Sequence, residues 1–186
     1  MHIMLTRPIE DSKELIFRFK SLGHKVSHLP VIDIKKIDIK NISYTDYSGI
    51  IFTSSNAVRF LETKNIDKTI YCFCVGSATE SYALKKGFQN VYAADGNVEN
   101  LKEIISQYFN KNSGKLLYVS GEVVSSNIHE QLIDLDYQVD RIINYSAQHI
   151  KEFDHKFIQD LKQNIPEIVY VCLLYTSDAA DERSSV

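Results

Sequence analysis

The stretch Gly49-Ile50-Ile51-Phe52-Thr53-Ser54-Ser55-Asn56-Ala57-Val58-Arg59-Phe60-Leu61 changes in its middle from an apolar run to four polar residues and then to a helical pattern. A short run of β-branched and aromatic residues predicts a buried strand, whereas Ala57, Phe60 and Leu61 recur at the spacing of one helix face. Hydroxyl and amide side chains cap helix starts, and the free N–H groups of a first helical turn bind anions. The stretch therefore predicts a strand, a turn and a helix, and the turn is either plain capping or part of an anion site.

Two later stretches repeat this change from an apolar run to small and hydroxyl residues. The run 71–75 leads into Gly76, Ser77 and Thr79, and the run 116–119 leads into Ser120, Gly121 and Glu122. Glycine lets a ligand approach the backbone, and serine or threonine opens a helix. Because the carboxyl ends of parallel strands share one edge of a sheet, we expect the three turns to lie together where open α/β sheets bind ligands.

Strand and helix patterns alternate from residue 49 to residue 143. The helix 98–109, capped by Asn97, has the clearest apolar stripe. Such alternation predicts a parallel sheet with helices on both faces. The predicted strands are 49–52, 69–75, 91–93, 115–119 and 138–143, and the predicted helices are 55–63, 78–86, 98–109 and 126–135.

The two ends of the chain carry fewer elements. Residues 2–5 and 26–29 predict strands, and between them Asp11 or Ser12 caps a helix that Gly23 ends. Residues 31–39 alternate with no helix after them, which predicts an exposed extended connector. Near the other end, apolar spacing predicts a helix that ends before Pro166, followed by a strand at 167–171.

Composition narrows the class of protein. The 186-residue chain is 44% hydrophobic and 24% charged, as globular proteins are. Its net charge of -3 gives no basic footprint for nucleic acid, and no apolar run is long enough to span a membrane. The opening residues are too few and too uncharged for a signal peptide, so we expect a cytoplasmic protein.

The sequence also lacks motifs for metals and nucleotides. Cys72 and Cys74 fall on one face of a predicted strand, where two buried core thiols are favoured over a metal pair. The histidines show no ligand spacing, and no phosphate-binding glycine loop is present. We therefore predict no metal site and no cofactor.

The last stretch, 172–186, shows neither strand alternation nor a helical stripe. Its residues 172–182 resemble a sequencing adapter translated in one frame. We expect 172–186 to be a non-native tail, and such segments are excluded from reasoning about the fold.

Short motifs occur in a fixed order along residues 1–171. They are Leu5-Thr6-Arg7-Pro8, Leu29-Pro30-Val31-Ile32, the stretch 51–58, Val75-Gly76-Ser77-Ala78-Thr79, Val119-Ser120-Gly121-Glu122 and Ile143-Asn144-Tyr145. In order and spacing they resemble the uroporphyrinogen-III synthase family. The resemblance implies an α/β fold of two flavodoxin-like lobes joined by a two-strand connector. The first lobe, 1–33 plus 146–171, is expected to be truncated, the second, 34–145, to be complete, and the chain as it stands to be inactive.

The same resemblance implies a reaction and its residues. A lyase of haem biosynthesis closes the linear tetrapyrrole hydroxymethylbilane to uroporphyrinogen III, with loss of water and inversion of the last ring, as a monomer without cofactor or metal. Tyr145 is then catalytic, and Arg7 meets a substrate carboxylate, with a surface salt bridge as the alternative. The three turns bind the substrate, chiefly through backbone N–H groups, at Thr53, Ser54, Ser55, Asn56, Gly76, Ser77, Thr79 and Gly121.

A function of another class stays open beside this one. A flavodoxin-like module that binds a small anion without catalysis has the same pattern of elements, because a fold does not fix a function. Formation of the III isomer from hydroxymethylbilane distinguishes the two.

Overall fold

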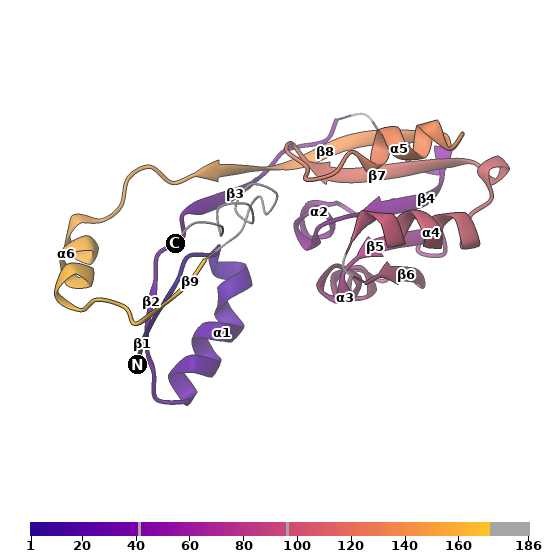
Figure 1. Ribbon diagram of the computed structural model, residues 1–186. Helices are drawn as coiled ribbons and strands as arrows, with labels where there is room; N and C mark the ends of the chain where they lie inside the picture. The colour runs from indigo at the N-terminus through magenta and orange to yellow at the C-terminus, as the bar shows by residue number, and fades with distance from the viewer. Residues whose placement is uncertain (41, 96, 172–186) are drawn as a thin grey trace, which may run out of the picture. The chain divides into compact units, whose positions relative to one another are not determined.

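The computed structural model describes residues 1–40, 42–95 and 97–171, and the chain divides into two compact units. Among the described residues, unit 1 comprises Met1–Ile34 and residues 147–171, and unit 2 comprises Lys35–Ser146. In Figure 1 the chain leaves unit 1 along β3 (Ile32–Lys36) and returns along β8 (Val139–His149). The segment 172–186, for which the sequence predicts a non-native tail, lies outside the described residues.

A six-stranded sheet runs through unit 2. β4 (Tyr47–Phe52) lies between β5 (Tyr71–Val75) and β7 (Lys115–Gly121). β6 (Asn90–Ala94) lies beyond β5, and β8 and then β3 lie beyond β7. The pairs β4–β5, β4–β7, β5–β6 and β7–β8 are parallel. Parallel neighbours need crossover connections, which are usually helices, so the predicted α/β class is confirmed.

The order of the parallel strands corrects one detail of the predicted fold. Counted along the chain, β6-β5-β4-β7-β8 reads 3-2-1-4-5. This is the Rossmann order, whereas a flavodoxin-like sheet reads 2-1-3-4-5. Both orders have the same alternation of elements and obey the same rule of right-handed crossovers, so the pattern of the sequence does not separate them. The observed order puts the topological switch point, where such sheets bind ligands, between β4 and β7.

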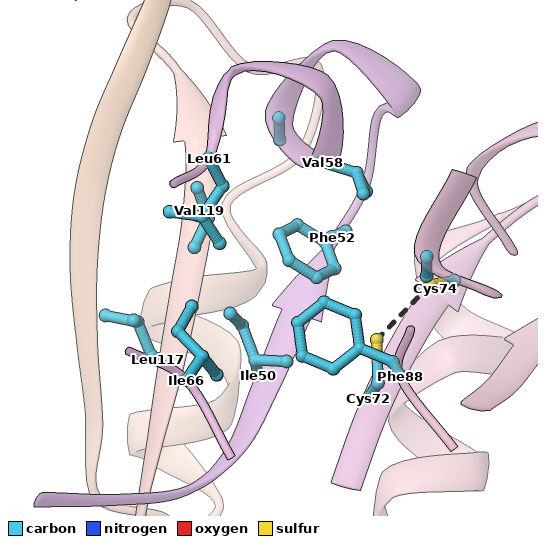
Figure 2. Close-up of a cluster of buried hydrophobic side chains, with 12 residues drawn as sticks. Ile50, Phe52, Val58, Leu61, Ile66, Cys72, Cys74, Phe88, Leu117 and Val119 are labelled. Carbon is cyan, nitrogen blue, oxygen red and sulfur yellow. Dashed lines mark hydrogen bonds between the residues drawn. The ribbon is translucent and has the colours of Figure 1, made fainter. Parts of the chain in front are cut away.

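Helices cover both faces of this sheet and create two hydrophobic cores. On one face, α2 (Ser55–Phe60) and α3 (Ser77–Lys85) contribute to the cluster around Ile50 and Phe52 that Figure 2 shows. On the other face, α4 (Val98–Tyr108) and α5 (Ile128–Asp134) cover Ile51, Phe73 and Tyr118. Neighbouring residues of a strand point to opposite faces, so β4 contributes side chains alternately to the two cores. Short 3-10 turns, η1 (Tyr44–Asp46) and η2 (Lys111–Ser113), precede β4 and β7.

Helix α2 is shorter than the predicted 55–63. It ends at Phe60 because Leu61 adopts an extended backbone, with φ -76° and ψ 128°, and buries its side chain in the first of these cores. Ala57 and Leu61 belong to this core whereas Phe60 is half-buried outside it, so the apolar spacing of the three residues does not mark one continuous helix. Tertiary burial has overridden the helical period here.

Strand β8 is longer than the predicted strand, which ended at residue 143. It continues to His149, and β3 pairs with it. The amide of Ile37 donates to the carbonyl of Asn144 at 2.9 Å, and that of Ile150 donates to the carbonyl of Val31 at 3.0 Å. Residue numbers thus fall along one strand as they rise along the other, which is antiparallel pairing. The added residues 144–149 are mostly polar, and it is the backbone pairing with β3 that holds them extended. Their side chains therefore show no apolar alternation from which a strand could be predicted.

Unit 1 contains a parallel sheet in the order β2-β1-β9. Its elements are β1 (His2–Leu5), α1 (Ile9–Ser21), β2 (Lys25–His28), α6 (His155–Gln163) and β9 (Ile168–Tyr170). Helix α1 begins before the predicted cap at Asp11 or Ser12, so that prediction was wrong. Pro8 is the N-cap, and the amide of Asp11 donates to its carbonyl at 3.1 Å. Proline suits a helix start because it lacks an N–H group that would have no partner there.

Candidate functional site

The turn after β4 is built mostly by capping. Ser54 is the N-cap of α2, and its side chain accepts a hydrogen bond from the amide of Asn56 at 3.2 Å. Thr53 exchanges a 3.0 Å hydrogen bond with the hydroxyl of Tyr118, at the switch point between β4 and β7. The Oδ1 atom of Asn56 is buried and meets no partner in the part of the chain that the structure describes. The capping interpretation therefore holds for Ser54, and Ser55 is the first residue of the helix.

The turn after β5 leaves several backbone donors without a partner. Gly76 has φ +79° and ψ 150°, a conformation that is essentially restricted to glycine. Its own N–H donates to the carbonyl of Ala94 at 2.9 Å and is not available to a ligand. The first bond of α3 runs from Glu80 to Gly76. Within the described residues, the amides 77–79 have no acceptor, as expected for the first turn of a helix.

The end of β7 differs from the predicted third turn. Ser120 and Gly121 lie inside the strand, because β8 extends the pairing past residue 119. Ser120 pairs with Ile143 and Gly121 pairs with Tyr145, so Asn144 forms a bulge in β8. The amide of Glu122 then donates to the carbonyl of Tyr145 at 2.9 Å. The bulge brings Tyr145 beside the end of β7.

The ring of Tyr145 packs directly on Gly121. A Cβ atom added to Gly121 would lie 2.6 Å from Cζ of Tyr145 and 2.9 Å from its hydroxyl oxygen. On another side, the ring centroid lies 6.4 Å from that of Phe60 at the end of α2. The hydroxyl has no protein partner among the described residues, and it is not one of the buried unpaired atoms. Within the described residues the O–H of Tyr145 is therefore a donor without an acceptor, and it is not fully buried. Tyr145 was predicted to follow the strand, but it lies within β8.

Arg7 belongs to unit 1. Its guanidinium pairs with the carboxylate of Asp11 at 3.7 Å, one helical turn along the chain. Its carbonyl accepts hydrogen bonds from His28 Nε2 at 2.8 Å and from the Ser12 hydroxyl at 3.1 Å. The salt-bridge alternative for Arg7 is thus present in the structure. The remaining predicted residues, Thr53, Ser54, Ser55, Asn56, Gly76, Ser77, Thr79, Gly121 and Tyr145, all lie in unit 2.

Three residues near these turns were missed by sequence reasoning: Tyr118, Arg141 and Asn144. Tyr118 is 1% exposed and carries the hydroxyl that meets Thr53. Burial raises the pKa of this phenol above its usual value, while the bond to Thr53 and the charge of Arg141 act in the opposite direction. No distinct signal in the sequence indicated Arg141 and Asn144, because β8 carries other polar residues such as Asp140 and Ser146.

Asn144, on β8, caps the carboxyl end of helix α2. It is fully buried, and its Nδ2 donates to the carbonyl of Ala57 at 2.7 Å. Ala57 supplies one of the last four carbonyls of α2, which the helix itself leaves unpaired. A side chain on β8 therefore fixes the helix that follows the Thr53–Asn56 turn.

We expect Asn144→Ala to lower the free energy of unfolding by about 1–3 kcal/mol, because it leaves a buried carbonyl without a donor. Urea denaturation measures the change, with the exposed Asn112→Ala as the matched control. Equal stability of the two variants would show that the bond to Ala57 contributes nothing.

The described residues contain no group of three or more His, Cys, Asp or Glu side chains placed to hold a metal ion. The Sγ atoms of Cys72 and Cys74 lie 3.9 Å apart, so both thiols do share one face of β5, and both are buried in the core that Figure 2 shows. Their contact, together with burial, raises the pKa of Cys72. Among the described residues, no helix is long and apolar enough to cross a membrane.

The fold and these turns define an α/β protein that presents free backbone donors and hydroxyl groups at the carboxyl ends of parallel strands. A family model described as uroporphyrinogen-III synthase HemD matches residues 13–178. The chain therefore belongs to the uroporphyrinogen-III synthase family. The matched range runs past residue 172, into the segment that the sequence predicts to be non-native.

Two solved structures resemble the fold. One is uroporphyrinogen-III synthetase from Helicobacter pylori, with 17% identity and a TM-score of 0.59 over 91% of this chain and 72% of that one. The other is a mutant uroporphyrinogen III synthase from Thermus thermophilus, with 12% identity and a TM-score of 0.54 over 91% of this chain and 71% of that one. A comparison with curated proteins found no significant match.

Proposed function

We propose that this chain performs the reaction for which its family is named and that the site lies at the carboxyl ends of β4, β5 and β7. The reaction closes hydroxymethylbilane to uroporphyrinogen III, with loss of water and inversion of the last ring. The linear substrate carries eight carboxylates, and its terminal hydroxyl leaves. Membership of the uroporphyrinogen-III synthase family supports this enzyme activity, which belongs to haem biosynthesis.

One observation carries the placement of the site: the ring of Tyr145 packs on Gly121 beside the switch point, with its hydroxyl unpaired. A phenolic O–H there can donate a hydrogen bond to the departing hydroxyl. We assign this role to Tyr145. The ring's packing on Gly121 and near Phe60 supports a fixed position for the donor.

Backbone N–H groups bind the acetate and propionate arms of the substrate in this proposal. The unpaired amides 77–79 at the start of α3 form the best-supported subsite. A helix start favours negative charge, so it can bind a carboxylate without a basic patch. Thr53, Ser54, Ser55 and Asn56 are assigned the same task at the start of α2, and Arg7 is assigned to bind a substrate carboxylate. The main contribution of the protein is to orient the flexible tetrapyrrole substrate so that its reacting carbons meet.

The test is incubation of the full-length protein with hydroxymethylbilane, followed by chromatography of the products. Spontaneous closure gives the I isomer, so an excess of the III isomer identifies the enzyme. Product at the spontaneous ratio, with retained binding of the substrate, would favour the alternative of a non-catalytic small-anion module.

Several coarser assignments accompany the proposal. Units 1 and 2 are assigned as two α/β lobes, the protein as a monomer without a cofactor, and its compartment as the cytoplasm. Nucleic acid is not a proposed partner, since the net charge of -3 supplies no basic footprint.

We expect Gly76→Val to raise KM well beyond the effect of Gly76→Ala. Both variants strain the backbone at φ +79°, by roughly 1–3 kcal/mol, so the alanine variant is the control for that strain. A Cβ at this position meets no atom within 4 Å, and therefore the branches of valine project into space that an arm of the substrate would use. Steady-state kinetics measure the difference, and Thr79→Ser should change little. Equal KM values for the alanine and valine variants would place the binding site elsewhere.

A further inference from the structure

The guanidinium of Arg141, on β8, is fixed by the end of β7. Nε donates to the hydroxyl of Ser120 at 2.8 Å. Nη2 donates to the carbonyls of Gly121 at 2.9 Å and Glu122 at 3.2 Å. The guanidinium carbon lies 5.9 Å from the ring centroid of Tyr118. A long, flexible side chain is thereby held in one place.

This anchoring leaves part of the guanidinium unused. Arginine has five N–H donors, and the bonds to β7 engage those on Nε and Nη2. Within residues 1–40, 42–95 and 97–171, no acceptor meets Nη1 and no carboxylate lies within 4 Å of the guanidinium. The bonds that hold it go to neutral oxygens, so its positive charge is not neutralised by a protein carboxylate.

The position of this charge relates it to the proposed site. The guanidinium lies over the ring of Tyr118, which is on β7. The hydroxyl of Tyr118 forms a hydrogen bond with Thr53, which follows the neighbouring strand β4 at the switch point. Gly121, whose carbonyl the guanidinium binds, supports the ring of Tyr145. Arg141 is therefore linked through Tyr118 to the turn after β4, and through the backbone of Gly121 to the position on which Tyr145 packs.

We propose that Arg141 is a substrate-binding residue, whose free Nη1 edge and charge bind one carboxylate arm of the tetrapyrrole. The inference rests on the proposed function and adds a binding residue to its site. A guanidinium that is already immobilised loses little side-chain entropy when a carboxylate binds, which favours this use. The competing role is purely structural: Arg141 only closes the end of β7.

The test compares Arg141→Gln and Arg141→Lys with the wild type in the full-length protein. Glutamine can still donate to the oxygens of β7 but has no charge, so KM should rise roughly 10- to 100-fold while kcat changes little. Lysine keeps the charge without the planar fork, and KM should rise only about threefold. Arg18→Gln, at an exposed position on α1, is the matched control and should leave KM unchanged. Thermal unfolding of each variant separates binding from stability.

A second readout keeps this inference distinct from the proposed function. Uroporphyrin III, the oxidised octacarboxylate macrocycle, is titrated by fluorescence against each variant, and Arg141→Gln should weaken its binding by a factor similar to the rise in KM. If the wild type forms the III isomer but the Gln and Lys variants keep its KM and affinity, the inference is overturned and the proposed function stands. If the wild type forms no III isomer while Arg141→Gln loses uroporphyrin, the function fails and the carboxylate site stands. Should Arg141→Gln not fold, Arg141→Lys decides: an unchanged KM and affinity would refute the inference.

Discussion

Replacing Tyr145 by phenylalanine is expected to lower kcat by about a hundredfold and to leave stability nearly unchanged, because a positioned proton donor typically contributes about 10²–10⁴-fold. Phenylalanine keeps the ring that packs on Gly121 and near Phe60. It removes only the hydroxyl, which makes no hydrogen bond to the described residues. Any loss of turnover therefore reports on contact with the substrate and not on lost protein structure.

The measurement is steady-state turnover of hydroxymethylbilane with separation of the III and I isomers, combined with thermal unfolding. Tyr82→Phe is the matched control, since Tyr82 lies on α3 and packs against the same core as Tyr145. That control should keep wild-type kcat. If Tyr145→Phe also keeps full turnover and an unchanged Tm, Tyr145 is only a packing aromatic.

The second large effect is expected for Gly121→Ala, which should lower kcat by about a hundredfold through displacement of Tyr145, because a misplacement near 1 Å can have an effect of about that size. The added Cβ would lie 2.6 Å from Cζ, 2.7 Å from Cε2 and 2.9 Å from the hydroxyl oxygen of Tyr145. Real Cβ atoms do not approach other atoms so closely, so the ring has to move away from the end of β7. We also expect a loss of roughly 1–3 kcal/mol in stability, typical of overpacking.

A double-mutant cycle distinguishes this route from a general disturbance of the strand. If Gly121→Ala acts by displacing the Tyr145 hydroxyl, it should lower kcat little further in the Tyr145→Phe background, because the hydroxyl is already gone. Additive losses in the double variant would mean that Gly121 matters for another reason. The Ala variant with wild-type kcat would show that the position of the ring is not important for turnover.

The sequence by itself determined the α/β class and the positions of most strands and helices. The alternation of apolar runs and amphipathic stripes from residue 49 to residue 143 depends only on local periodicity, which a sequence displays directly. It also indicated capping residues in the turn Thr53–Asn56 and a cap at Asn97, because capping joins residues two or three positions apart. The family, too, could be inferred from short motifs in their order along the chain.

The tertiary structure decided what depends on contacts between distant residues. The sheet order 3-2-1-4-5 is one example, since several orders share one pattern of elements. The extension of β8 is another, because pairing with β3 holds a polar segment extended. That extension and its bulge set Tyr145 on Gly121 and Asn144 on Ala57, and the pairing of β8 with β7 sets Arg141 on the end of β7. Each of these contacts joins residues 20 or more positions apart in the sequence, so only the folded chain brings them together.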